Sequence, residues 1–461
     1  MKTLDLLGAV AKGQISATEV CEASISRIES TDSQVNAFTE RMWEPARTQA
    51  KEIDRRRQTG ETVPALAGLP FAVKNLFDIE GVVTLAGSKI NRSLPAAKAD
   101  AVLVQRLKAS GAVLLGALNM DEYAYGFTTE NAHYGPTHNP HDLTRVSGGS
   151  SGGSGASVAA EQVPLALGSD TNGSIRVPAS LCGVWGLKPT FGRLSRRGTF
   201  PFVHSIDHLG PLGDCVEVLA LSYDAMQGAD ALDPGCHATQ SQPVTDLLWK
   251  GIKDLRIGLL SGYFDEFASA PAQAVARLAA HTLGATDRVT WPDAQRGRAA
   301  AFIVTASEGG SLHLKNLQSR IDDFEPLIVD RLVSGALQPA DWYVKAQRFR
   351  RVYRDRVNAL FENWDVLIAP ATPVCAPVIG SDWIEINGIQ HASRPAMGLL
   401  TQPISFAGCP VVAAPMWPDE TDGMPIAVQL ISAPWREDLA LRAAMVLQQS
   451  GVSHLKKASL P

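Results

Sequence analysis

The sequence has few cysteines, and their arrangement excludes some classes of protein. Its 461 residues include six cysteines, none of which forms a C-x-x-C pair. Scattered cysteines in a chain of this length are typical of buried thiols in a reducing compartment. We therefore expect a cytoplasmic protein without a disulfide framework.

Long apolar runs and long runs of one charge are also absent. No apolar stretch approaches the roughly 20 residues needed to cross a bilayer, and Asp5 interrupts the only apolar stretch near the N-terminus, which disfavours a signal peptide. The net charge is −5, with both signs spread along the chain. The one basic stretch, residues 348–356, has the spacing of a solvated helix face. We expect neither membrane nor nucleic-acid binding.

The chain has enough apolar sequence for a large core, since hydrophobic residues make up 45% and charged residues 19%. A capping-box pattern at 16–19 predicts a helix start, and a charged helix is expected over 44–57. Further predicted helices span 100–110, 156–160 and 348–360, and predicted strands span 112–118, 163–167, 255–260, 366–369 and 411–414. This alternation is typical of an α/β protein. With no repeat and no long linker, we expect an N-terminal helical arm over 1–60 and one large domain over 61–461.

Glycine and serine are concentrated in residues 147–155. A flexible linker has such a composition, but buried segments are expected on both sides. The pattern Gly148-x-Ser150-x-Gly152 matches the nucleophile elbow of α/β-hydrolases, yet that elbow requires a preceding strand, and residues 138–144 are predicted to be a loop. The remaining interpretation is a rigid turn, in which glycine permits positive φ and close backbone approach. Such a turn can direct a serine hydroxyl into a cleft.

A second glycine-containing segment follows over 168–178. Its successive N–H groups can form an oxyanion hole if they point in one direction. These N–H groups belong to Thr171, Asn172, Gly173 and Ser174. Asp170 and Arg176 flank Ser174 and can fix the segment through a charge-assisted bond. A tight structural turn is the alternative interpretation.

Lys74 ends the apolar run Phe71-Ala-Val-Lys74. An isolated ammonium is costly to bury, and burial lowers the pKa of a lysine. A neutral lysine is a competent general base. A lysine whose ammonium extends from a strand end to water is an equally simple interpretation.

Together these segments resemble the amidase signature family. The matching residues are Gly68-Leu-Pro-Phe-Ala-Val-Lys-Asn75, Gly148-Gly-Ser-Ser-Gly-Gly-Ser154 and Gly168-Ser-Asp-Thr-Asn-Gly-Ser-Ile-Arg176, in this order. The resemblance extends from about residue 60 to the C-terminal region. It implies an α/β fold with a large mixed β-sheet covered by helices on both faces.

The resemblance also implies a Ser–Ser–Lys triad that requires neither a metal nor a cofactor. Lys74 is then the base, Ser150 the bridging serine after a cis peptide bond, and Ser174 the nucleophile, with Ser151, Asp170 and Arg176 in support. Many members have glycine where this chain has Asn172. Asn tolerates the αL conformation better than other non-glycine residues, so we expect the loop to persist, with the Asn172 side chain near the substrate.

Two subgroups of the family share further residues with the chain. Segments 121–126, 129–131, 135–140 and 345–347 are similar to the glutaminase component of the tRNA-dependent amidotransferase. Its arginine for the glutamine carboxylate corresponds to Arg350. Its aspartate for the glutamine ammonium would fall near Gly398, where no carboxylate occurs. An unpaired buried ammonium is expensive, so glutamine fits poorly.

The run 170–195 is more similar to hydrolases of 1-carboxybiuret in cyanuric acid breakdown, which release ammonia and leave 1,3-dicarboxyurea. This resemblance implies a small anionic amide substrate, and we expect Tyr125 and Arg350 to contact it, although Tyr125 can equally be a packed core aromatic. It also implies a small helical partner subunit, like the C subunit of the amidotransferase, in a homo- or hetero-oligomer. The alternatives are a glutaminase, a general amidase and an inactive scaffold for that small partner.

Overall fold

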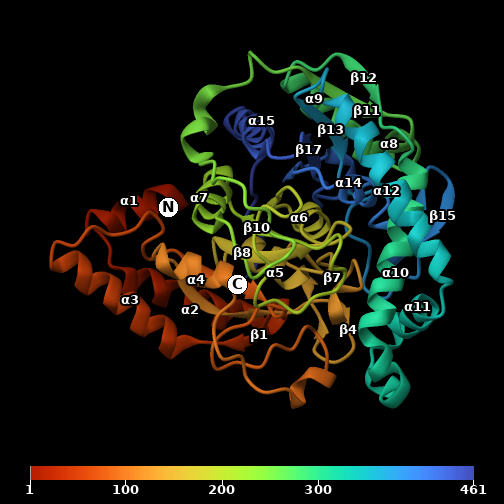
Figure 1. Ribbon diagram of the computed structural model, residues 1–461. Coiled ribbons are helices and arrows are strands. Elements are labelled where there is room, and N and C mark those ends of the chain that lie inside the picture. The colour runs from red at the N-terminus through yellow and green to blue at the C-terminus, as the bar shows by residue number, and fades with distance from the viewer. Residues whose placement is uncertain (1, 461) are drawn as a thin grey trace.

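The computed structural model describes residues 2–460, and one large sheet runs through its centre (Figure 1). Within these residues eleven strands form a single mixed sheet. In spatial order the strands are β1 (Phe38–Arg41), β3 (Val113–Leu118), β2 (Pro70–Lys74), β8 (Leu165–Asp170), β10 (His208–Gly213), β9 (Trp185–Lys188), β16 (Val411–Ala414), β17 (Val428–Ser432), β13 (Val366–Pro370), β11 (Ile257–Ser261) and β12 (Asp287–Thr290). The sets β3–β2–β8 and β13–β11–β12 are parallel, and the other neighbours are antiparallel.

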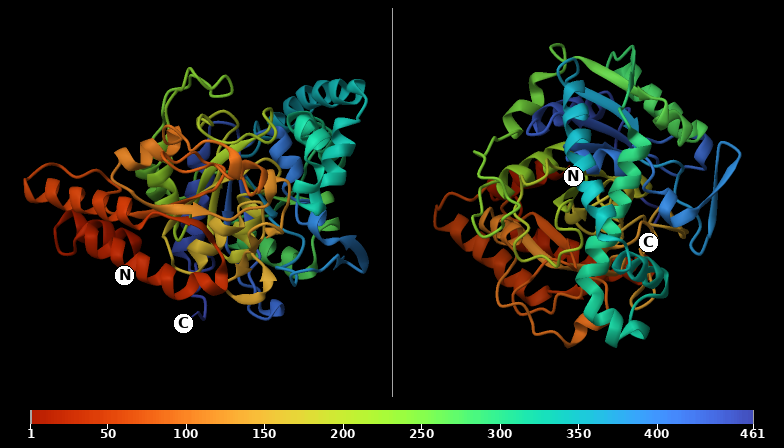
Figure 2. Two further views of the ribbon diagram at one scale, coloured as in Figure 1. Left: turned by 90° about the horizontal axis from the view of Figure 1, so that it is seen from below. Right: turned by 45° about the vertical axis from the view of Figure 1, so that its right-hand side comes forward.

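Helices pack on both faces of the sheet, as predicted (Figures 1 and 2). Side chains alternate along a strand, so on β2 Phe71 and Val73 belong to one apolar cluster and Ala72 belongs to the other. The helices are α1 (Thr3–Ala11), α2 (Ala17–Val35), α3 (Trp43–Gln58), α4 (Val102–Ala109), α5 (Gly152–Ala159), α6 (Arg176–Cys182), α7 (Val216–Met226), α8 (Tyr263–Glu266), α9 (Ala270–Thr282), α10 (Ala294–Ser319), α11 (Pro326–Ala336), α12 (Ala340–Leu360), α13 (Ser393–Ala396), α14 (Gln402–Ala407) and α15 (Glu437–Gln449).

The N-terminal segment lies at one end of the molecule, and α10 and α11 lie at the other (Figure 2). Helix α2 begins with the predicted capping box, in which the Ser16 side chain accepts from the Glu19 N–H and the Glu19 side chain accepts from the Ser16 N–H. Between α2 and α3, strand β1 pairs with β3 at the sheet edge. The proposed boundary at residue 60 therefore separates segments that share a sheet.

Four predictions about local structure were wrong in extent or kind. The helix predicted over 348–360 is α12, which begins eight residues earlier at Ala340. Residues 138–144 do not form a loop, because β6 (His138–Asn139) and β7 (Asp142–Val146) pair as a small two-stranded sheet outside the main one. The strand predicted over 163–167 is β8, and it continues to Asp170 because it pairs with β10 as far as His208. The helix predicted over 156–160 is α5, which begins at Gly152 inside the Gly/Ser segment.

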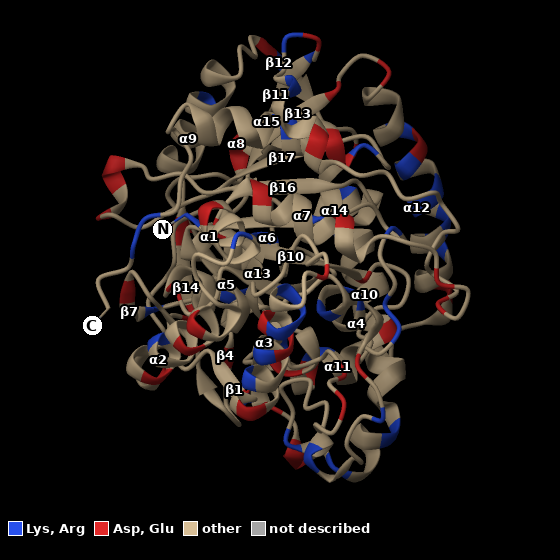
Figure 3. Ribbon diagram, turned by 90° about the vertical axis from the view of Figure 1, so that its left-hand side faces the viewer, with Lys and Arg blue, Asp and Glu red and all other residues tan. Residues whose placement is uncertain are grey.

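Two further small sheets flank the main one. They pair β4 (Glu130–Asn131) with β5 (Gly135–Pro136) and β14 (Trp383–Ile386) with β15 (Ile389–Ala392). Positive and negative residues are interspersed over the face seen in Figure 3. None of the helices in the described part of the chain has the length and apolar character needed to span a membrane.

Candidate active site

Lys74 is the last residue of β2, and its side chain is fully buried. Its amine nitrogen Nζ lies 2.7 Å from Oγ of Ser150, 2.9 Å from Oγ of Ser169 and 3.0 Å from Oγ of Ser151. None of the ion pairs formed among residues 2–460 includes Lys74. The amine thus lies among hydroxyl groups and has no counter-charge in contact.

Burial lowers the pKa of Lys74 from 10.5 to about 7, and the negative charges of Asp121, Asp207 and Asp170 offset this effect only in part. A large fraction of the side chain is therefore neutral at neutral pH. A neutral amine has a lone pair that can accept a proton from a hydroxyl, while its N–H groups donate to the other hydroxyls. This arrangement suits a general base.

The Gly/Ser turn, residues 147–155, presents two of these hydroxyls, those of Ser150 and Ser151. The peptide bond between Gly149 and Ser150 is cis, as the family resemblance implied. A Cβ atom on Gly149 would lie 2.1 Å from Oδ2 of Asp121, so only glycine permits this close approach. Oγ of Ser151 donates to the carbonyl of Ser169 at 3.2 Å and accepts from its N–H at 3.3 Å. These bonds attach the turn to β8.

A buried ion pair braces the turn that follows β8. The carboxylate of Asp170 accepts from Nε and Nη2 of Arg176, each at 2.9 Å, and both side chains are fully buried. Burial by itself would raise the pKa of Asp170, but the Arg176 guanidinium outweighs it and holds this pKa well below its ordinary value. Nη1 of Arg176 also donates to Oε1 of Gln429 at 2.7 Å. The start of α6 is thereby fixed to the end of β8.

The backbone N–H groups of residues 171–174 form no hydrogen bond with any described residue, although the segment is buried. Buried N–H groups are nearly always paired in native structures. Gly173 has φ +139°, and a Cβ atom there would lie 2.2 Å from Oγ1 of Thr401, so this position requires glycine. Four unpaired N–H groups on one turn can stabilise a negatively charged oxygen.

Asn172 does not adopt the αL conformation, and the expectation that its tolerance of αL preserves the loop was wrong. The residue of this turn with positive φ is Gly173, so position 172 needs no such tolerance. Nδ2 of Asn172 donates to Oγ1 of Thr305 at 2.9 Å, and its carbonyl accepts from Oγ1 of Thr401 at 2.6 Å. Its Oδ1 has no partner among residues 2–460. This oxygen is available to a ligand.

Ser174 lines a narrow cavity. Among the described residues, no hydrogen bond joins its Oγ to Ser150 or Lys74. The polar side chains of the cavity wall are those of Tyr125, Thr171, Asn172, Ser174, Thr305, Arg331 and Gln402. The structure therefore brings Lys74, Ser150 and Ser151 into contact and places Ser174 on the wall of an adjoining cavity. Catalytic hydrogen bonds are often loose before substrate binds.

The two residues expected to contact substrate are placed differently. Tyr125 lines the cavity, but Arg350 of α12 does not. The Arg350 guanidinium instead donates to the carbonyls of Ser205 at 2.7 Å and Phe406 at 3.1 Å. Its contact with substrate stays a prediction that this arrangement does not favour.

Sequence reasoning missed two residues of the site, Arg331 and Ser169. Arg331 is a single cation on the amphipathic helix α11, and no motif surrounds it. Ser169 precedes Asp170 in the segment resembling the family, so a strand extended by three residues would have placed it beside Lys74.

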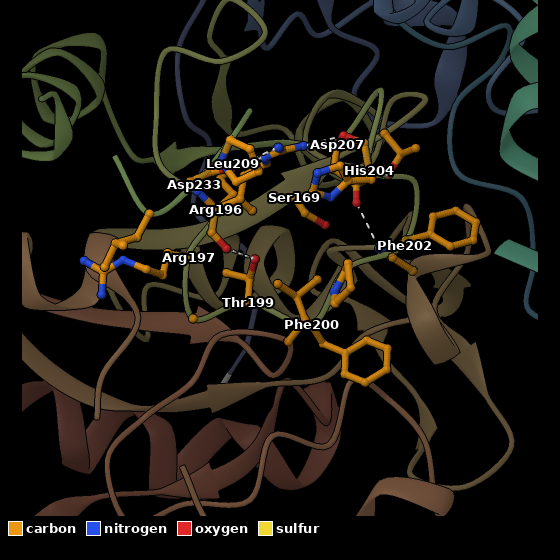
Figure 4. Close-up of a pocket in the computed structure, with 17 residues that line it drawn as sticks. Ser169, Arg196, Arg197, Thr199, Phe200, Phe202, His204, Asp207, Leu209 and Asp233 are labelled. Atoms are coloured by element: carbon orange, nitrogen blue, oxygen red, sulfur yellow. Dashed lines mark hydrogen bonds and ion pairs between the residues drawn. The ribbon is translucent and has the colours of Figure 1, made fainter. Parts of the chain in front are cut away.

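A second cavity lies next to the first, and Ser169 and Phe202 line it (Figure 4). Thr171 lines both cavities. Oγ1 of Thr171 donates to Asp207 at 2.6 Å, which connects this cavity to the turn that precedes Ser174. Two arginines also line this second cavity. Each has a carboxylate partner, with Arg196 paired to Asp233 at 3.1 Å and Arg197 paired to Asp230 at 2.8 Å.

The family model described as amidase matches residues 19–441. AtzE of Pseudomonas sp. (strain ADP), a component of 1-carboxybiuret hydrolase, is 69% identical over 456 residues, which cover 99% of this chain and 100% of that protein. The A component of the glutamyl-tRNA(Gln) amidotransferase of Moorella thermoacetica is 37% identical over 484 residues, covering 97% of this chain and 96% of that protein.

A solved structure is similar over the same extent. It is described as a vestigial protein complex that reveals the evolutionary origins of an s-triazine catabolic enzyme. It matches with a TM-score of 0.98 at 69% identity and covers 99% of this chain and 100% of its own. These matches agree with the predicted fold. The chain therefore belongs to the amidase signature family.

Proposed function

We propose that this chain hydrolyses 1-carboxybiuret, releasing ammonia and leaving 1,3-dicarboxyurea. The observation that supports this substrate most directly is the 69% identity, over essentially both whole chains, to a component of a 1-carboxybiuret hydrolase. The buried amine of Lys74, surrounded by serine hydroxyls, supports the reaction type.

In the proposed first step, neutral Lys74 takes the proton of Ser150 while Ser150 takes that of Ser174. Oγ of Ser174 attacks the carbonyl carbon of the terminal amide, and the C=O electron pair moves to the oxygen. The N–H groups of residues 171–174 stabilise this oxyanion. A neutral base and two hydroxyls suffice for the proton transfers.

The tetrahedral intermediate then collapses. Its C–N bond breaks, and the proton held by Lys74 returns through Ser150 to the leaving nitrogen, which departs as ammonia. The carbonyl group is left on Ser174 as an acyl-enzyme. Water attacks this carbonyl while the same relay takes one of its protons. The C–O bond to Ser174 then breaks, the relay returns that proton to Oγ of Ser174, and the product is released.

A glutaminase is the second candidate, because the glutaminase component of an amidotransferase is 37% identical to the chain. A glutamine substrate brings an ammonium that needs a counter-charge. No Asp or Glu side chain is among the residues that line the Ser174 cavity. The geometry therefore favours an anionic substrate without an ammonium.

We further propose that the chain works in the cytoplasm in a complex with a small helical protein. The relative of 69% identity is named as one subunit of its enzyme, and the similar solved structure is described as a protein complex. Size-exclusion chromatography with light scattering, applied to the chain alone and mixed with a candidate small partner, tests this proposal. A mixture in which the two proteins elute separately contradicts it.

The test of function is ammonia release from 1-carboxybiuret, biuret, glutamine and a simple amide. We expect 1-carboxybiuret to have the highest kcat/KM, and Ser174→Ala to lower its release of ammonia by about 1,000-fold or more. Preference for glutamine would overturn the substrate. Unchanged release by Ser174→Ala would overturn the mechanism and leave the scaffold alternative.

A further inference from the structure

One cation on the wall of the Ser174 cavity has no counter-charge. Of the arginines that line this cavity and the one beside it, Arg196 and Arg197 each contact a carboxylate. Arg331 takes part in none of the ion pairs formed within residues 2–460. A half-buried guanidinium without a carboxylate is a costly arrangement unless an anion joins it.

The protein fixes Arg331 but leaves most of its donors unused. Its guanidinium carbon lies 3.8 Å from the centre of the Tyr125 ring, and Nη1 donates to the Tyr125 carbonyl at 3.1 Å. Within the described part of the chain, Nε and Nη2 form no hydrogen bond. A guanidinium has five N–H donors in a planar fork. The stacked ring therefore orients a fork whose remaining donors match a carboxylate.

The rest of the wall complements an uncharged amide. Oδ1 of Asn172 is buried and has no hydrogen-bond partner among residues 2–460, and the buried hydroxyl of Tyr125 interacts with the Arg331 side chain. An amide oxygen accepts from N–H groups, and a phenol can donate or accept. A ureide offers both N–H donors and carbonyl acceptors.

We propose that Arg331 binds the carboxylate of the substrate, while Asn172 and Tyr125 contact its amide groups. Arg331 is thus the specificity-determining residue of the cavity, and it takes the role that the sequence suggested for Arg350. The cavity selects small amides with a carboxylate and no ammonium. This inference rests on the proposed function, which places the scissile amide at Ser174.

The test compares two substrate pairs that differ in one carboxylate, 1-carboxybiuret against biuret and malonamate against malonamide. In wild type we expect the carboxylated member of each pair to have the higher kcat/KM. In Arg331→Met this preference should fall by about 100-fold, the effect of losing a charged hydrogen-bonded partner, with a rise in KM. Release from the uncharged member should stay within a few-fold of wild type.

Two further variants keep the test decisive. Arg331→Lys keeps the charge but loses the fork, and we expect an intermediate preference even if Arg331→Met folds poorly. Arg348→Met is the matched control, because Arg348 is exposed on α12, and it should retain the wild-type preference. Circular dichroism checks that each variant is folded.

The outcomes separate this inference from the proposed function. If wild type releases ammonia from malonamate but not from 1-carboxybiuret, the proposed substrate fails, and the malonamate pair still tests Arg331. If Arg331→Met and Arg331→Lys lower both members of a pair equally, or neither of them, the role of Arg331 is overturned.

Discussion

At the scale of single residues, two lysines of the described chain show how similar burial can lead to different chemistry. Lys74 and Lys188 are both fully buried, and burial lowers the pKa of each to about 7. Nζ of Lys188 donates to the carbonyls of Cys409 at 2.5 Å and Pro189 at 3.1 Å. A carbonyl group cannot donate a proton to the amine, whereas each hydroxyl group around Lys74 can. The neighbouring groups therefore decide which amine can act as a base.

The two serines should behave as one unit in mutational tests. We expect Ser174→Ala and Ser150→Ala each to lower kcat by about 1,000-fold or more, and the double variant to be no worse than the less active single variant, because the residues act in one relay. Steady-state ammonia release measures this non-additivity. Losses that multiply in the double variant would mean that Ser150 acts independently of Ser174.

At the scale of elements, the site forms where parallel strands β2 and β8 end at the same edge of the sheet. Their register pairs Val73 with Leu167. Lys74 directly follows Val73, and Ser169 is the second residue after Leu167, so their side chains meet at 2.9 Å. The turn into α6 follows β8 directly. Two adjacent strand ends thus position residues that are far apart in the sequence.

Much of this level could be predicted from the sequence, and the failures have physical reasons. The strands 113–118 and 411–414 are apolar runs buried on both faces, so composition identified them. The polar end of β8 was missed because its pairing with β10 is a long-range contact. The start of α5 was missed because glycine is a poor helix former, and close packing overrides that preference here.

Close packing at the Gly/Ser turn gives a test with an internal control. Gly149→Ala would place a methyl group 2.1 Å from Oδ2 of Asp121, whereas Gly8 of α1 has no atom within 4 Å of an added Cβ. We expect Gly149→Ala to lower kcat/KM by about 100-fold or more, because a misplaced catalytic group is costly. Gly8→Ala should leave activity unchanged and raise stability by up to about 1 kcal/mol. Full activity of Gly149→Ala would show that the turn tolerates movement.

The ion pair that braces the second turn predicts a large loss of stability when it is broken. Asp170→Asn leaves the buried Arg176 charge uncompensated, which costs about 3–5 kcal/mol. Urea unfolding measures this loss. Glu52→Gln, which breaks an exposed pair with Arg56 on α3, is the control and should change stability little. Similar effects of the two variants would contradict a bracing role for Asp170.

At the scale of the whole molecule, the N-terminal segment and the rest of the chain share one core. Buried residues of α2 and α3, such as Ile25 and Ile53, belong to the same apolar cluster as Ala72 of β2 and Leu115 of β3. Strand β1 closes the sheet edge beside β3. We propose that the 1–60 arm is a distinct segment of sequence but not an independent folding unit.

Deleting residues 1–60 tests this proposal. We expect the 61–461 fragment to lose cooperative thermal unfolding and to aggregate, because the deletion exposes the apolar cluster and the edge of β3. Calorimetry and light scattering measure both effects. A soluble fragment with a single sharp transition would establish 61–461 as a self-sufficient domain.

The proposed mechanism requires an uncharged amine at position 74, and nuclear magnetic resonance of ¹³Cε-labelled lysines measures the titration of this amine directly. The Lys74 signal, assigned by its loss in Lys74→Met, should titrate with a midpoint near pH 7, since its pKa is lowered to about 7. Because the neutral form is the base, kcat/KM should rise with pH through the same midpoint. A midpoint near 10, or activity that falls as pH rises from 6 to 8, would contradict a neutral lysine base.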